Sequence, residues 1–115
     1  MTDGAHEDAT DRRLLLLSAR DNVGVATTTL HAGERVLVRG AFVVVVSPVG
    51  IGHKMAVRPI AAGEHVIKYG MSIGSATCPI APGEHVHTHN LKSDYFPGAT
   101  AETERTETAA TGGRA

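Results

Sequence analysis

Leu30-His31-Ala32-Gly33-Glu34-Arg35-Val36 is a stretch whose frame occurs three times in this chain of 115 residues. Ile60-Ala61-Ala62-Gly63-Glu64-His65-Val66 and Ile80-Ala81-Pro82-Gly83-Glu84-His85-Val86 repeat it: an aliphatic residue, two spacers, Gly-Glu, any residue and Val. A glycine at the fourth position allows a positive φ in a tight turn, and the flanking aliphatic residues are expected in the core. The copies lie 30 and then 20 residues apart, which indicates a recurring turn and not a solenoid.

The sequence around these turns predicts an all-β fold. Short runs rich in Val and Ile alternate with Gly and Pro at close spacing. No window of useful length shows the 3.6-residue apolar period of an amphipathic helix. The predicted strands cover residues 14–19, 23–28, 35–38, 41–47, 55–58, 65–69, 75–78 and 85–88.

The two ends of the chain have the composition of solvated tails. Residues 1–13 contain no aliphatic residue except Met1 and alanine, and residues 98–115 consist of Gly, Ala, Thr, Glu and Arg. Such stretches bury too little apolar surface to offset the entropy of ordering. We therefore predict disordered tails at 1–13 and 98–115 and a single domain at 14–97.

Charge and composition exclude several function classes. The formal net charge of −1 gives no basic footprint for nucleic acid or for an anionic membrane surface. The longest apolar run, residues 41–46, falls far short of the roughly 20 residues that a membrane-spanning helix needs. The polar, acidic start lacks the features of a secretory signal, and one cysteine fits a reducing cytoplasm. We expect a cytoplasmic protein in which Cys78 is a small buried residue.

The predicted domain is slightly cationic and rich in histidine. It holds seven Lys and Arg against five Asp and Glu, together with six of the seven histidines. This balance favours a small anionic ligand over a polyanion. Because a small core with few aromatic residues supplies little stability, we also expect a partner subunit or a homo-oligomer.

The strongest local feature is Gly83-Glu84-His85-Val86-His87-Thr88-His89-Asn90. In an extended strand, alternate side chains share a face, which would put His85, His87 and His89 on one side. Two imidazoles at this spacing can converge on a metal such as Zn, Fe, Ni or Cu, with a third ligand from a bend after His89 or from another chain. The histidines could instead act as a general base or as donors to a carboxylate. The plain alternative is a solvated polar strand face.

A second cluster is Gly50-Ile51-Gly52-His53-Lys54. The two glycines let the backbone approach a neighbour closely, and His53 and Lys54 then offer two cationic or donor groups where a loop meets a strand. The alternative is a flexible loop with exposed charges. Lys68, in Lys68-Tyr69-Gly70, is a weaker candidate of the same kind.

Several motifs together resemble a known family. Asp21-Asn22-Val23-Gly24-Val25-Ala26, Gly52-His53-Lys54-Met55-Ala56, Val66-Ile67-Lys68-Tyr69-Gly70, Ile73-Gly74 and the histidine segment 83–90 occur in this order. The pattern is similar to the N-terminal SAF domain of altronate dehydratase (the UxaA family) and to the stand-alone small subunit of sulfolactate sulfo-lyase. The resemblance runs from about Ala19 to Tyr95. Related galactarate dehydratases lack the His-Val-His-x-His-Asn piece, which places this chain nearer the altronate and sulfolactate branch.

The resemblance implies a β-clip fold and membership of a sugar-acid lyase. In single-chain members a large domain follows the SAF domain, whereas this sequence continues into a tail of Thr, Ala, Glu and Gly. The expected partner is therefore a separately encoded large catalytic subunit. The implied reaction removes water from an aldonate to give a 2-keto-3-deoxy acid, or sulfite from a sulfolactate. The implied cofactor is a divalent metal, Fe(II) in the first place, shared with the large subunit.

Site roles follow as expectations from this resemblance. His85, His87 and His89 would face the cleft between subunits as catalytic residues, and His85 and His87 would also be metal ligands. The residues expected to bind the anionic substrate are His53, Lys54, Lys68 and Asn90. The competing interpretation is a non-catalytic module that binds substrate or docks on the large subunit. A free-standing metal-binding enzyme is a weaker alternative, because so small a domain cannot enclose a pocket by itself.

Overall fold

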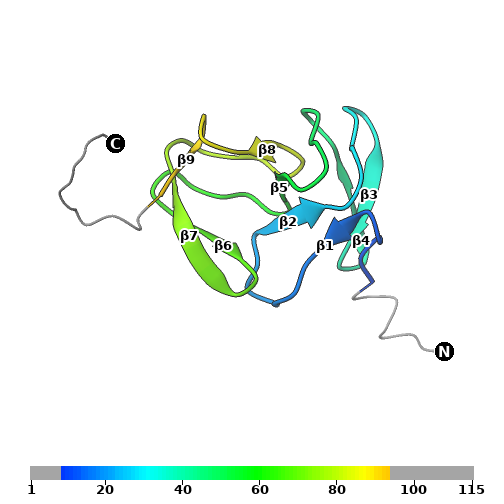
Figure 1. The fold of residues 1–115 in the computed structure, drawn as a ribbon, viewed down its shortest axis with the longest axis horizontal. Coiled ribbons are helices and arrows are strands. Elements are labelled where there is room, and N and C mark those ends of the chain that lie inside the picture. Colours follow the sequence, from blue (N-terminus) through cyan, green and yellow to red (C-terminus); the bar gives the residue numbers. More distant parts are fainter. Residues whose placement is uncertain (1–8, 94–115) are drawn as a thin grey trace.

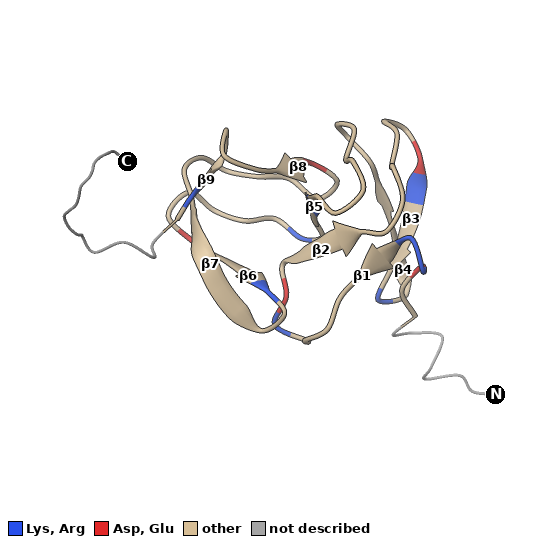
Figure 2. Ribbon diagram, viewed as in Figure 1, with Lys and Arg blue, Asp and Glu red and all other residues tan. Residues whose placement is uncertain are grey.

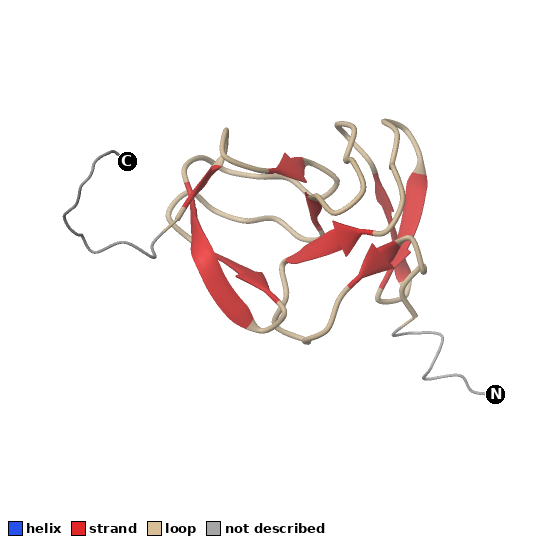
Figure 3. Ribbon diagram, viewed as in Figure 1, coloured by secondary structure: helices blue, strands red, loops and turns tan. Residues whose placement is uncertain are grey.

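Strands make up the regular structure of this protein (Figure 3). The computed structural model describes residues 9–93, and no residue in that range is helical, so the range contains no helix that could cross a membrane. The prediction of an all-β fold is confirmed. The strands are β1 (Leu14–Leu15), β2 (Val23–Ala26), β3 (Arg35–Val38), β4 (Ala41–Val44), β5 (Lys54–Ala56), β6 (His65–Lys68), β7 (Met71–Ala76), β8 (His85–Val86) and β9 (Leu91–Lys92).

These strands pair antiparallel in three sheets. One sheet has the order β1-β2-β5-β8, the second is the β3–β4 hairpin and the third has the order β6-β7-β9. Figure 1 shows the β3–β4 hairpin at one end of the domain, the β6–β7 hairpin at the other and the four-stranded sheet between them. Both hairpins close through two-residue turns, Arg39-Gly40 and Tyr69-Gly70, whose positive φ angles are those of a type I′ turn.

The three Gly-Glu turns predicted from the sequence are confirmed. In each, the glutamate N–H donates to the carbonyl three residues earlier at 2.9–3.1 Å, and the glycine has a φ between +84° and +92°. This is the arrangement of a type II turn, which requires a positive φ at its third residue. The aliphatic residues that flank the turns are all buried: Leu30, Val36, Ile60, Val66, Ile80 and Val86.

A fourth turn of the same geometry, which the sequence pattern did not reveal, lies at residues 50–53. The N–H of His53 donates to the carbonyl of Gly50 at 2.9 Å, and Gly52 has a φ of +82°. Val49 before this turn and Met55 after it are fully buried, as in the other three. His53 occupies the place that glutamate holds elsewhere, so the Gly-Glu signature is absent here.

Each of the four turns docks on one buried residue at or just past the end of a strand. The turn glycine donates its N–H to the carbonyl of that buried residue. In return, the buried residue donates its N–H to the carbonyl of the residue that follows the glycine. All of these hydrogen bonds are 2.8–2.9 Å long. The residues that receive the turns are Val45 for Gly33, Ala26 for Gly52, Ala76 for Gly63 and Ala56 for Gly83. These paired hydrogen bonds fix the position of every turn relative to a strand.

The four turns form two pairs, each with its own hydrophobic core. Leu30 and Val49 exchange two backbone hydrogen bonds at 2.8–2.9 Å, and Ile60 and Ile80 do the same. Ile60 lies 30 residues after Leu30, and Ile80 lies 31 residues after Val49. The second half of the domain therefore repeats the arrangement of the first. The first core contains Leu14, Ala26, Leu30, Val36, Val38, Val45, Val49, Met55 and Val57. The second contains Val23, Ala56, Ile60, Val66, Ala76, Ile80 and Val86.

Two buried polar residues, Asp21 and Asn22, tie the segment before β2 to the β6–β7 hairpin. The Asp21 carboxylate accepts hydrogen bonds from the backbone N–H groups of Leu17 and Ser18 at 3.1 Å and of Gly70 at 2.7 Å. Asn22 accepts from the N–H of Ile67 at 2.7 Å and donates to the His65 carbonyl at 2.9 Å. The sequence pattern Asp-Asn-Val-Gly therefore has a structural role at the junction of the two halves.

Strand limits differ from the prediction where a turn controls them. β7 begins at Met71 and not near Ser75, because the Tyr69-Gly70 turn returns the chain directly beside β6. β8 ends at Val86 instead of Thr88. β9, two residues long, was not expected, because so short a strand has no periodic pattern.

Residues 9–13, which composition assigns to the N-terminal tail, are paired with the β3–β4 hairpin. The N–H of Asp11 donates to the carbonyl of Leu37, and the carbonyl of Ala9 accepts from Gly40, both at 2.8 Å. The Arg13 guanidinium hydrogen-bonds the Asp11 carboxylate and lowers the pKa of Asp11 to about 2. Backbone pairing thus orders a polar segment. The rest of both predicted tails, and the predicted domain end at 97, lie outside the described residues.

Replacing Gly83 with alanine should destabilise the domain more than replacing Gly63. Both glycines have a positive φ, which costs an alanine about 1 kcal/mol. At Gly63 an added Cβ meets nothing within 4 Å, whereas at Gly83 it would lie 2.0 Å from the carbonyl oxygen of Val44. Urea denaturation should give a loss of about 1 kcal/mol for Gly63→Ala and at least 2 kcal/mol more for Gly83→Ala. Equal losses would contradict the close packing of this turn on β4.

Asp21→Asn should destabilise the protein at neutral pH and lose that effect in acid. Burial by itself would raise the pKa of Asp21, but the N–H donors of Gly70, Leu17 and Ser18 lower it overall. A lowered folded-state pKa stabilises the fold above the unfolded value of about 3.9, and this contribution is lost as the pH falls through the folded value. Urea denaturation should show a gap of about 1–3 kcal/mol between the two proteins at pH 7 that shrinks below pH 4. A gap that stays constant down to pH 2.5 would contradict this.

Candidate functional site

Four histidine rings gather where β8 meets the 50–53 turn. The Nδ1 atom of His53 lies 3.0 Å from the Nε2 atom of His85. The ring of His87 stacks on that of His85, with centroids 5.6 Å apart and planes 10° apart, and lies 5.4 Å from His53. The ring centroid of His89 is 5.6 Å from that of His85. His85 is partly buried and the other three rings are exposed.

His85 lies on strand β8, but His87 and His89 reach the cluster through a turn, whereas the sequence predicts a strand for all three. β8 ends at Val86, and the N–H of Asn90 donates to the carbonyl of His87 at 3.0 Å. An extended chain would separate the side chains of His85 and His89 by about 13 Å, given a rise of about 3.3 Å per residue. The turn brings both His87 and His89 to 5.6 Å from His85.

The side chain of Asn90 holds this turn in place. Its Oδ1 accepts a hydrogen bond from the N–H of His87 at 2.9 Å, and its Nδ2 donates to the carbonyl of His85 at 3.0 Å. Asn90 is only 4% exposed. Substrate binding is its predicted role, but both ends of its amide are bonded to backbone, which makes Asn90 a positioning residue for the histidines.

His53 comes to the cluster from the first half of the domain. The fourth turn sets its backbone, and strand β5, which follows directly, pairs with β8 so that Met55 lies opposite His85. The N–H of His85 also donates to Ser47 Oγ at 3.0 Å. A carboxylate contact is the role predicted for His53, and the structure places its ring against the other imidazoles. One sequence signal could have located His53. Gly52 lies three residues after Val49 and three before Met55, the same spacing as in the three Gly-Glu turns.

Lys54 adds positive charge beside the histidines, and Lys68 lies close enough to Lys54 to affect its pKa. Burial, and then the charge of Lys68, lower the pKa of Lys54. Burial, and then the charges of the other three histidines and Lys54, lower the pKa of His85. Within residues 9–93 no carboxylate forms an ion pair with Lys54 or Lys68. Lysine and arginine elsewhere are spread over several elements of the ribbon (Figure 2). A small anion bound beside β5 would relieve the repulsion among these groups.

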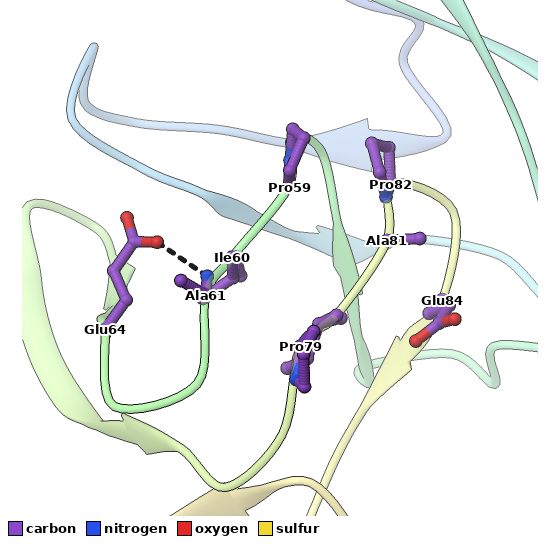
Figure 4. Close-up of a pocket in the computed structure, with 9 residues that line it drawn as sticks. Pro59, Ile60, Ala61, Glu64, Pro79, Ala81, Pro82 and Glu84 are labelled. Atoms are coloured by element: carbon purple, nitrogen blue, oxygen red, sulfur yellow. Dashed lines mark hydrogen bonds between the residues drawn. The ribbon is translucent and has the colours of Figure 1, made fainter.

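An open groove of about 500 Å³ lies elsewhere, between the Gly63-Glu64 and Gly83-Glu84 turns (Figure 4). Its walls come from residues 59–64 and 79–84, and its charged side chains are Glu64 and Glu84. Glu64 accepts a hydrogen bond from the N–H of Ala61 at 2.8 Å (Figure 4). Two carboxylates would repel an anionic ligand, so the histidine cluster and not this groove is the candidate site for one.

Cys78 and His65 have surroundings of a different kind. Cys78, expected to be buried, is exposed, because it lies in the segment between β7 and the Ile60–Ile80 pairing. His65 lies on β6, and its Nδ1 is 3.1 Å from Ser72 Oγ.

The donor set of the cluster fits a divalent transition metal. His53, His85 and His87 each offer one ring nitrogen, and these three atoms lie within 4.8 Å of one another. Imidazole nitrogen suits Zn, Fe, Ni and Cu, whereas Mg and Ca prefer oxygen. The lowered pKa of His85 favours the neutral ring that a metal requires.

Fold and site together define a small all-β domain with an imidazole-rich face, a module of the SAF class. The sequence model of the family described as "Altronate/galactarate dehydratase SAF domain" matches residues 12–94. The chain therefore belongs to the SAF domain family of altronate and galactarate dehydratases.

Individual relatives place the chain more closely. Altronate dehydratase of Escherichia coli (strain K12) is 45% identical over 78 residues, which are 68% of this chain and 16% of that enzyme. Altronate dehydratase of Bacillus subtilis (strain 168) is 34% identical over 83 residues, 72% of this chain and 17% of the enzyme. The (2R)-sulfolactate sulfo-lyase subunit alpha of Chromohalobacter salexigens is 49% identical over 43 residues, 37% of this chain and 46% of the subunit. The chain thus spans about a sixth of the altronate dehydratases that it matches.

Asn90→Ala should loosen the histidine turn without unfolding the domain. It removes two hydrogen bonds from a buried amide, which we expect to cost about 1–3 kcal/mol. The imidazole resonances of His87 and His89 should shift in NMR spectra, while those of His31 stay in place. Lys92→Ala, on the exposed end of β9, is the control and should leave all of them unchanged. Unshifted His87 resonances in Asn90→Ala would show that the turn does not depend on this amide.

Proposed function

We propose that this chain is the SAF module of a hydroxy-acid lyase of the altronate dehydratase type. The observation that carries the proposal is the packing of four imidazoles beside the half-buried Lys54, in a chain of the dehydratase SAF family. The module acts with a catalytic module carried on a separate large subunit. Their joint substrate is an aldonate, and the product is a 2-keto-3-deoxy acid.

The reaction needs three kinds of group, and this chain offers candidates for each. A base removes the proton on the carbon next to the carboxylate, the hydroxyl on the following carbon leaves with a proton from an acid, and the resulting enol becomes the keto acid. His85, His87 and His89 are the candidate base and acid, because an imidazole can either accept or donate a proton. Where His85 and His87 bind the metal, His89 is the ring left for proton transfer. Lys54 and Lys68 hold the carboxylate and oppose the negative charge that develops, and His53 does so in a cluster that holds no metal.

A divalent metal, Fe(II) in the first place, is the proposed cofactor, shared with the large subunit. Bound at the histidine cluster, it would supply positive charge for the enolate and for the leaving hydroxyl. Lys54 is half-buried beside the cluster. Its ammonium group would orient the substrate carboxylate next to the metal.

An exposed apolar stripe beside the cluster is the proposed contact with the large subunit. Phe42, Val44 and Val46 are 51–58% exposed, at alternate positions that share one face along β4 and the residues after it. The stripe ends next to the cluster, because the N–H of Val46 donates to the carbonyl of Gly83 at 2.8 Å and Ser47 bonds His85. A partner that covers the stripe would also exclude water from the histidines, which strengthens their electrostatic effect.

The second candidate is the alpha-type subunit of a sulfolactate sulfo-lyase. The similarity to two sulfo-lyase alpha subunits, at 47–49% identity over 43 residues, favours it. The two candidates differ in the leaving group, water against sulfite, and share the base and the carboxylate contacts. A substrate-binding or docking role with all chemistry on the large subunit is the non-catalytic alternative.

The test is reconstitution with a separately expressed large subunit of the altronate dehydratase type. The two purified proteins together should convert an aldonate to a 2-keto-3-deoxy acid, and neither should do so alone. Lys54→Met should leave the complex intact and lower kcat/KM by about 10- to 100-fold, the loss expected for one charged hydrogen bond. Val44→Asp should instead abolish complex formation with the large subunit in gel filtration. A mixture of this variant and the large subunit should show little activity at any concentration tested.

The outcomes separate the alternatives. Sulfite release from sulfolactate with no keto acid from aldonates would assign the second candidate. Full activity of the large subunit without this chain would overturn a catalytic role. Arg58→Met, an exposed cation away from the histidines, is the matched control for Lys54→Met and should keep wild-type kcat/KM.

A further inference from the structure

We propose that His53, His85 and His87 of this chain form by themselves a binding site for one divalent transition metal ion. The inference deepens the proposed function and rests on it only for the role of the metal. It differs from the expectation from sequence, in which the third ligand came from His89 or from another chain. Here His53, from the fourth turn, is that ligand.

The positions of the three nitrogens carry the proposal. Metal–imidazole bonds of about 2.0–2.1 Å put ligand nitrogens about 3.0–3.4 Å apart around one ion. His53 Nδ1 and His85 Nε2 are already 3.0 Å apart, and all three donor atoms lie within 4.8 Å of one another. His53 and His87 are exposed, so a side-chain rotation of His87 can close the remaining gap without disturbing the core.

The backbone beneath the rings is held from several directions. His85 is fixed by its strand pairing with Met55 and by Ser47, and His87 by Asn90. His53 lies in a turn, and its own carbonyl accepts a hydrogen bond from the N–H of Ala26 at 2.8 Å. Sites built on such fixed backbone lose less conformational entropy when they bind a ligand. Among the described residues, the three donors that lie close together are those of His53, His85 and His87; His89 is outside this set, with its ring 5.6 Å from that of His85.

The ligand set also defines which metals bind and what they can do. Three neutral imidazoles favour Zn²⁺, Co²⁺, Ni²⁺ or Fe²⁺ over Mg²⁺ and Ca²⁺, and they leave the ion its full double charge. Three protein ligands leave coordination positions open, as in catalytic metal sites. Because His53 and His87 are exposed, an anionic hydroxy acid could reach an ion held by these rings.

The experiment is a titration of the full-length, tag-free chain with Zn²⁺ by calorimetry and with Co²⁺ by visible absorbance. We expect one ion per chain and no binding of Mg²⁺. Loss of an outer-shell partner alone costs 10- to 100-fold in affinity, so His53→Ala, His85→Ala and His87→Ala should each weaken binding by at least about 100-fold. Thermal unfolding without metal checks that each variant is folded, and His53→Gln repeats the test with a polar side chain of similar size.

His89→Ala and His31→Ala are the controls, one inside the ring cluster and one outside it, and each should change the affinity by less than about threefold. Wild-type affinity in a folded His53→Ala would overturn the proposal, as would a His89→Ala variant that loses metal as completely as His87→Ala. Metal binding without elimination activity in the reconstituted pair would leave this site standing and contradict the proposed function. Elimination activity in a chain that binds no Zn²⁺ or Co²⁺ would contradict this metal site and leave the proposed function standing.

Discussion

Paired backbone hydrogen bonds between a glycine turn and one buried residue are the constraint on which this structure depends. They occur four times, at 2.8–2.9 Å, and each places a turn against the end of a strand. The regular strands are only two to six residues long, too short to hold a sheet together by pairing alone. The turns supply the missing connections, and the flanking aliphatic residues fill the two small cores.

The candidate site depends on the same constraint. The turn at 50–53 presents His53, and the turn at 81–84 delivers the chain into β8, so the cluster forms where the two halves of the repeat meet. β5 lies between them and carries Lys54. A site assembled in this way has a fixed backbone on both sides and side chains that remain in contact with solvent. In our proposal it forms one wall of an active site, which fits a chain whose matched part spans about a sixth of each altronate dehydratase.

Sequence alone was enough for the class of the fold and for most of the site's members. The Gly-Glu frame predicted three turns and six buried aliphatic positions, because a positive φ and a buried flank leave a local signature. The fourth turn escaped because His53 replaces the glutamate, and the turn at His87 escaped because its stabilising contact is the side chain of Asn90, which a strand pattern does not reveal. Residues 9–13 were assigned to a tail because their order comes from pairing with a distant hairpin, a non-local effect that composition cannot show.

The hydrogen bonds that dock each turn do not depend on the side chain of the residue after the turn glycine. Glu34, His53, Glu64 and Glu84 occupy this position, and the hydrogen bonds that dock the turn use only their backbone atoms. Evolution can therefore change the chemistry at these four surface points while the stability of the fold is conserved. A designer could use the same freedom, placing a chosen functional group at any of the four turns of this scaffold without redesigning its core.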